Sequence, residues 1–125
     1  MEEVKIFKER AKRFFISARE NYKKGFYDLA IFDLEQCAQL LLKSKLLEKV
    51  GEFPKTHSLS LLLEEIGKLG NKKAVEKFLA RYSLLITKLE DSYITARYFP
   101  RRFFKEEIKE LFSFIKELER FLEEL

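Results

Sequence analysis

The residues best suited to chemistry lie in one short segment, SYITARYFPRRFF, which spans residues 92–104. Three arginines in this segment alternate with tyrosine and phenylalanine rings. A guanidinium group binds phosphate through two parallel hydrogen bonds, and an aromatic ring can stack on a nucleobase. The mixture therefore predicts a binding site for a nucleotide or RNA. Its candidate ligand-binding residues are Arg97, Tyr98, Arg101 and Arg102.

The same segment also has a purely structural interpretation, as the turn between two helices. Phe103 and Phe104 can begin the apolar stripe of a last helix, and Pro100 prevents the preceding helix from continuing. The arginines then cap carbonyl oxygens or pair with neighbouring carboxylates. The two interpretations differ most at Arg97, which precedes the turn, because a helix end can direct its side chain into a groove.

Other common sites are missing from the sequence. It has no glycine-rich phosphate loop, no Cys and His pairs at zinc spacing, and no Glu three positions before its single histidine, His57. We therefore expect neither a metal nor a cofactor. His57 lies between Thr56 and Ser58, where all three side chains can accept hydrogen bonds from the first amides of a helix. Isolated helical carboxylates such as Glu35 and Glu90 are expected to be solvated.

The composition indicates one helical domain over residues 1–125. Only four glycines and two prolines are available for turns, whereas Leu, Lys and Glu, which favour helices, are abundant. The net charge of +4 is mild, and 37% charged residues with few Asn and Gln are typical of heat-adapted proteins. The lone Cys37 is expected to be a buried small hydrophobe. No signal peptide or membrane-length apolar run is present, so we expect a cytoplasmic protein.

The spacing of apolar residues by three and four predicts five helices. These helices cover residues 2–24, 27–50, 58–68, 71–93 and 104–125. Four long helices and one short helix with short connections favour an up-and-down all-α bundle. The helix over 27–50 is apolar nearly all round, so it is either the central helix or part of a homodimer interface.

Three stretches carry a resemblance to a known family. YDLAIFDLEQCAQLLLKSKLL (27–47), FPKTHSL (53–59) and YITARYFP (93–100) resemble the second helix, the Pro-x-x-His-x-Leu junction and the Arg-Tyr-x-Pro turn of the HEPN family. The resemblance covers nearly the whole chain. It implies a compact helical bundle that pairs with itself and binds nucleotides, RNA or a small nucleotidyltransferase, in an arrangement of the toxin–antitoxin type.

Two departures from the family pattern bear on activity. Ribonuclease members carry an Arg followed four to six residues later by His; Arg97 matches the Arg, but no histidine follows it. The resemblance therefore implies a binding domain rather than an enzyme. The alternative is a metal-independent ribonuclease in which His57, brought close by the fold, replaces the missing histidine. Gln39 stands where an acidic residue is common, before a lysine matched by Lys43, which is a further candidate ligand-binding residue.

Overall fold

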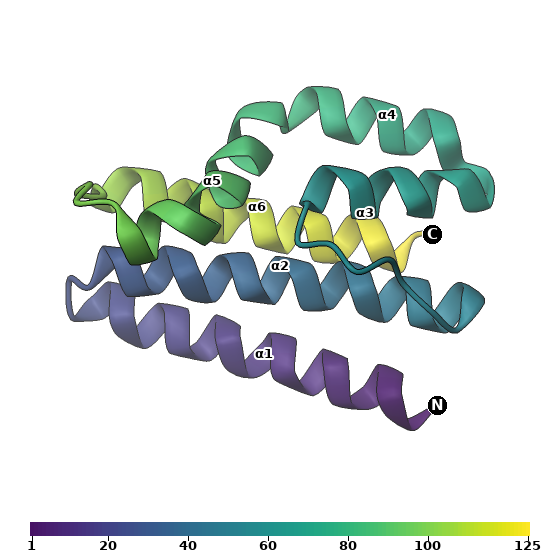
Figure 1. Ribbon diagram of the computed structural model, residues 1–125, viewed down its shortest axis with the longest axis horizontal. Coiled ribbons are helices and arrows are strands. Elements are labelled where there is room, and N and C mark those ends of the chain that lie inside the picture. Colours follow the sequence, from purple (N-terminus) through teal and green to yellow (C-terminus); the bar gives the residue numbers. More distant parts are fainter.

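The computed structural model describes all 125 residues, and every element in it is a helix (Figure 1). The elements in chain order are α1 (Glu2–Lys23), α2 (Tyr27–Val50), α3 (Leu59–Ile66), a π-helical turn η1 (Gly67–Asn71), α4 (Lys72–Arg81), α5 (Ser83–Tyr98) and α6 (Lys105–Glu123). Helices α1, α5 and α6 pack on α2, and α3 and α4 form a hairpin beside them. The predicted all-α bundle is confirmed.

The ends of the long helices follow local signals in the sequence. Gly25 follows α1 and Gly51 follows α2, with φ angles of 77° and 79°. Glycine adopts this left-handed conformation without the steric penalty of a Cβ, so both helices end where the sequence predicted. Helix α6 begins after Phe104, because the carboxylate of Glu107 accepts a hydrogen bond of 2.7 Å from the Phe104 amide.

The single helix predicted over residues 71–93 is wrong, because the chain bends at Tyr82 and forms α4 and α5 there. Tyr82 has φ −108° and ψ 18°, and its ring packs against Phe78 and Phe114. Helix α4 packs on α3, whereas α5 turns away from it to pack on α2 (Figure 1). A straight helix could not make both contacts. Helix α5 also continues beyond the predicted end, to Tyr98.

Helix α2 is the central helix, as its apolar circumference predicted. Helices α1, α3, α5 and α6 all contact it. Its largest fully buried side chains are Ile31, Leu34 and Leu42. Because the chain's own helices cover α2, its apolar surface no longer supports self-association, and the homodimer stays a prediction. None of the helices combines the length and apolar character needed to cross a lipid bilayer.

Candidate functional site

Arg97 lies in the last turn of α5, and its guanidinium lies between two aromatic rings. Its central carbon is 4.8 Å from the ring centroid of Phe32 on α2 and 4.5 Å from that of Tyr93 on α5. Arg97 is exposed, and its side chain makes no ion pair and no hydrogen bond within the protein. Cation–π contacts occupy the faces of the planar guanidinium and leave the N–H groups on its edge free.

His57 joins the same cluster from the loop before α3. Its ring is stacked on Tyr93, with centroids 4.0 Å apart and an interplanar angle of 8°. Tyr93 therefore contacts both the imidazole of His57 and the guanidinium of Arg97, which also contacts Phe32. We call Phe32, Arg97, Tyr93 and His57 the Arg97 stack.

Hydrogen bonds between α3 and α5 position His57. Glu90 accepts hydrogen bonds from the hydroxyls of Ser58, at 2.9 Å, and Ser60, at 2.8 Å. The Ser58 hydroxyl also accepts a bond from the Leu61 amide and so caps α3. His57 immediately precedes this anchor, and Tyr93 lies one turn beyond Glu90 on α5. The cap of α3 is thus Ser58, and His57 is free to stack on Tyr93. Glu90 was expected to be solvated, but its carboxylate is hydrogen-bonded to two serine hydroxyls.

A row of polar side chains on α2 continues from the stack. Glu35 is fully buried and accepts hydrogen bonds from Gln36, at 2.7 Å, and Gln39, at 2.6 Å. The amide oxygen of Gln39 in turn accepts a bond of 3.1 Å from the ammonium of Lys43. That ammonium lies 5.2 Å from the ring centroid of Phe53, in the loop after α2. The row therefore ends in a second cation on an aromatic ring.

Burial dominates the electrostatics of this row. Burial raises the pKa of Glu35, although the bonds from Gln39 and Gln36 and the charges of Arg97 and Lys43 act in the opposite direction. Burial also lowers the pKa of Lys43, against the attraction of Glu35. The expectation that Glu35 is solvated is wrong. Two signals in the sequence could have indicated that Glu35 is buried. Most of its neighbours on α2 are apolar, and Gln39, four residues later, can donate a hydrogen bond to it.

The other arginines of the 92–104 segment have different surroundings. Arg101 forms an ion pair of 2.9 Å with Glu107 and lies over the ring of Phe103. Burial acts to raise the pKa of Glu107, but the bonds from Arg101 and the Phe104 amide outweigh it and hold that pKa below its ordinary value. Arg101 thus supports the start of α6, whereas Arg102 is exposed and Tyr98 is 70% exposed.

The predicted site residues therefore fall into three groups. Arg97 and His57 both contact Tyr93 in the stack, and Lys43 lies along α2 from it. Tyr98 and Arg102 are exposed beside the stack in sequence, without recorded partners. Arg101 is held by Glu107.

The sequence matches the family model described as HEPN domain over residues 4–125. The chain belongs to the HEPN domain family. No curated protein is similar enough to the chain to add to this assignment. The three stretches that carried the resemblance converge in this HEPN domain: residues 27–47 contribute Phe32 and Lys43, residues 53–59 contribute His57, and residues 93–100 contribute Arg97.

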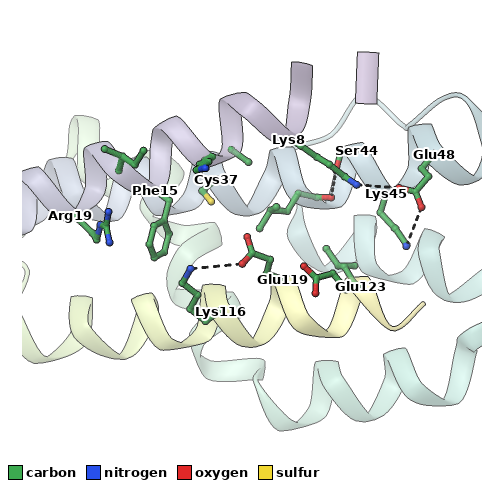
Figure 2. Close-up of a pocket in the computed structure, with 15 residues that line it drawn as sticks. Lys8, Phe15, Arg19, Cys37, Ser44, Lys45, Glu48, Lys116, Glu119 and Glu123 are labelled. Atoms are coloured by element: carbon green, nitrogen blue, oxygen red, sulfur yellow. Dashed lines mark hydrogen bonds and ion pairs between the residues drawn. The ribbon is translucent and has the colours of Figure 1, made fainter. Parts of the chain in front are cut away.

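The largest of the four main hollows of the HEPN domain lies elsewhere, between α1, α2 and α6 (Figure 2). This α1–α6 cleft has a volume of about 580 Å³. Three of its five cations have acidic partners: Lys8 and Lys45 both lie 3.4 Å from Glu48, and Lys116 lies 3.9 Å from Glu119. None of the four main hollows includes Arg97. The groove around Arg97 therefore stays a prediction.

Cys37 lines the same cleft but is 2% exposed, which confirms its prediction as a buried small hydrophobe. Burial raises the pKa of its thiol to about 12, with the charge of Glu119 acting in the same direction. The thiol therefore stays protonated at neutral pH, and a protonated, buried thiol is a poor nucleophile.

Proposed function

We propose that this HEPN domain binds a nucleotide or RNA at the Arg97 stack. The observation that carries the proposal is the unpaired guanidinium held between Phe32 and Tyr93. The rings restrict its plane, so little side-chain freedom is lost when a phosphate binds, while its edge keeps two parallel donors for phosphate oxygens. The buried carboxylate of Glu35 does not compete for those donors at the surface.

Neighbouring side chains add contacts for a base and for further phosphates. The ring of Tyr98 is exposed one residue from Arg97 and is available to stack on a base. Arg102 is exposed as well and adds positive charge. Arg101 contributes less, because its guanidinium is already paired with Glu107.

Replacement of the stacked guanidinium tests the proposal. We expect Arg97→Ala to weaken binding of a labelled single-stranded RNA, followed by fluorescence anisotropy, by about tenfold or more, because a charged hydrogen-bond donor is lost. Arg19→Ala is the matched control, since Arg19 lies over the ring of Phe15 in the cleft. Affinity should also fall steeply as salt rises. Unchanged binding by a folded Arg97→Ala protein would refute the proposal.

The proposal includes protein partners. We infer that the domain forms a homodimer and works with a small nucleotidyltransferase in a pair of the toxin–antitoxin type; the family membership supports this inference. Co-purification with the product of the adjacent gene tests the pairing. Sedimentation velocity at micromolar concentration tests the homodimer, and a purely monomeric species would refute it.

A second candidate function is a metal-independent ribonuclease, and the position of His57 against Tyr93 favours it. In this reaction Arg97 holds the phosphate while the imidazole of His57 accepts the proton of the ribose 2′-hydroxyl. The 2′-oxygen then bonds to phosphorus as the bond from phosphorus to the 5′-oxygen breaks, and the 5′-oxygen takes a proton from water. The products are a 2′,3′-cyclic phosphate and a 5′-hydroxyl end. Cleavage of an RNA pool in EDTA, lost in both Arg97→Ala and His57→Ala, would establish this activity; an inactive wild-type chain would exclude it.

A further inference from the structure

A second cation lies on the same face of α2 as the Arg97 stack. Lys43 follows Phe32 by eleven residues, and the polar residues between them on this side are Glu35, Gln36 and Gln39. The Lys43 ammonium is bonded to the side chain of Gln39, which lies about 10 Å along the helix axis from Phe32 at a rise of about 1.5 Å per residue. The two cations of this face are thus separated by roughly 10 Å.

The ammonium of Lys43 has capacity for an additional anion. It carries three donors, and its one recorded hydrogen bond goes to the neutral amide of Gln39. Its other contact is the ring of Phe53, and no carboxylate forms an ion pair with it. Lys43 is partly buried, and the burial that lowers its pKa is a desolvation that a bound anion would offset.

The surface between the two cations presents no negative charge to a ligand. Glu35, the carboxylate of the row, is fully buried, and both of its oxygens accept bonds from glutamine amides. Gln39 is 7% exposed. Aromatic rings stand at both ends, with the exposed Tyr98 next to Arg97 in the chain and Phe53 beside Lys43. A strip with a cation and a ring at each end suits a sugar–phosphate strand with unpaired bases.

We propose that the ligand is a single-stranded oligonucleotide that places one phosphate at Arg97 and another at Lys43. This inference rests on the proposed function and selects the oligonucleotide over the mononucleotide. Each strand of duplex DNA rises about 3.4 Å per nucleotide, and at that spacing a separation of roughly 10 Å corresponds to about three nucleotides. A mononucleotide reaches one cation only.

A length series tests this inference. Competition against a labelled six-nucleotide oligouridylate measures the affinity of UMP and of oligouridylates of two, three, four and six nucleotides. We expect affinity to rise up to about three or four nucleotides and then to level off. A parallel series of oligothymidylates separates RNA from DNA. If UMP binds as tightly as the six-mer, the inference is wrong while the proposed function stands; if no member binds, both are wrong.

Two lysines of α2 provide matched variants. Lys43→Met removes the charge and keeps an unbranched side chain, so we expect it to weaken six-mer binding roughly five- to tenfold and to affect UMP binding far less. The slope of the logarithm of the binding constant against the logarithm of the salt concentration should become shallower by about 0.7 in this variant. Lys45→Met is the control, since Lys45 pairs with Glu48 in the cleft. Equal loss of UMP and six-mer binding in a folded Lys43→Met protein would overturn the inference.

Discussion

The Arg97 stack and the α1–α6 cleft both place cations on aromatic rings, but they differ in what balances the charge. In the cleft, Phe15 lies between Arg19 and Lys116, at 5.7 and 4.5 Å (Figure 2). Lys116 has Glu119 beside it there. In the stack, Arg97 has two rings and no ion pair, and the carboxyl that its charge acts on, Glu35, is buried. Lys116 therefore has a carboxylate beside it at the surface, whereas Arg97 has none.

This difference explains why we place the candidate site outside the largest of the main hollows. The cleft exists because α1 and α6 both pack on α2 with few contacts between them. Its volume thus follows from the spacing of the bundle, and its ion pairs are of the exposed kind that contributes little energy. The stack encloses little volume, but it orders a guanidinium and leaves the donors on its edge free. Chemistry, more than shape, distinguishes the two regions.

The strongest test of the comparison reverses one charge in each region. Arg97→Glu should weaken binding of single-stranded RNA by about a hundredfold, because it removes the phosphate donors and adds repulsion. Lys116→Glu changes the net charge equally but lies in the cleft, so its effect should be confined to the small long-range term that salt screens. Fluorescence anisotropy at 0.15 M salt measures both. Comparable losses in the two variants would mean that binding depends on overall charge and not on the stack.

Removing one ring from each region separates stability from binding. Phe15 packs edge-on against Phe112, so Phe15→Ala should destabilise the fold by about 2–3 kcal/mol and leave the affinity of the folded protein unchanged. Tyr93→Ala should weaken binding about tenfold, because Arg97 and His57 both lose the ring that orders them. Urea unfolding and anisotropy measure the two effects. A loss of RNA affinity in folded Phe15→Ala protein would contradict this difference between the cleft and the stack.

Removing the hydrogen bonds of Ser58, which position His57, should have a smaller effect on binding. Ser58→Ala removes both the cap of α3 and the bond to Glu90, and should cost about 1 kcal/mol in the free energy of unfolding. Binding should weaken only about twofold to threefold, since Arg97 keeps both of its rings. Ser113→Ala, on an exposed position of α6, is the control. A loss as large as that of Arg97→Ala would place the centre of the site at His57.

Local signals predicted much of the fold. Gly25 and Gly51 end their helices through their own backbone conformations, so these boundaries depend on nothing distant in the sequence. The bend at Tyr82 escaped prediction because apolar residues keep the same three-and-four spacing on both sides of it. The spacing of apolar residues indicates which face of a helix is buried. It does not indicate whether the helix axis changes direction, as it does at Tyr82.

The candidate site was predictable only in part, because it depends on tertiary neighbours. The sequence singled out Arg97, but it could not separate this residue from Arg101, whose partner Glu107 lies in the next helix. The position of Glu107, three residues after Phe104, was an available sign of a helix cap. The stacking of His57 on Tyr93 could not be predicted, since it requires α3 and α5 to be placed side by side.

The pH dependence of stability provides the finest contrast, because two carboxyls of α2 shift in opposite directions. Burial raises the pKa of Glu35, so the folded protein holds this proton more tightly than the unfolded chain does. Its contribution to stability is fully present below the ordinary pKa of 4.5 and is lost as pH rises through the raised value. In the cleft, burial acts to raise the pKa of Glu48, but Lys45 and Lys8 outweigh it and lower that pKa. The contribution of Glu48 is therefore present above 4.5 and is lost as pH falls through the lowered value.

Urea unfolding between pH 3 and pH 8 at low ionic strength measures both shifts against Glu35→Gln and Glu48→Gln. The stability of the wild type relative to Glu35→Gln should fall as pH rises above 4.5, and its stability relative to Glu48→Gln should rise with pH below 4.5. The Glu48 effect should be the smaller, because its side chain is 42% exposed and its ion pairs are screened by solvent. Slopes of the same sign would contradict the comparison, because the carboxyl beneath the stack would then be as solvated as the one in the cleft.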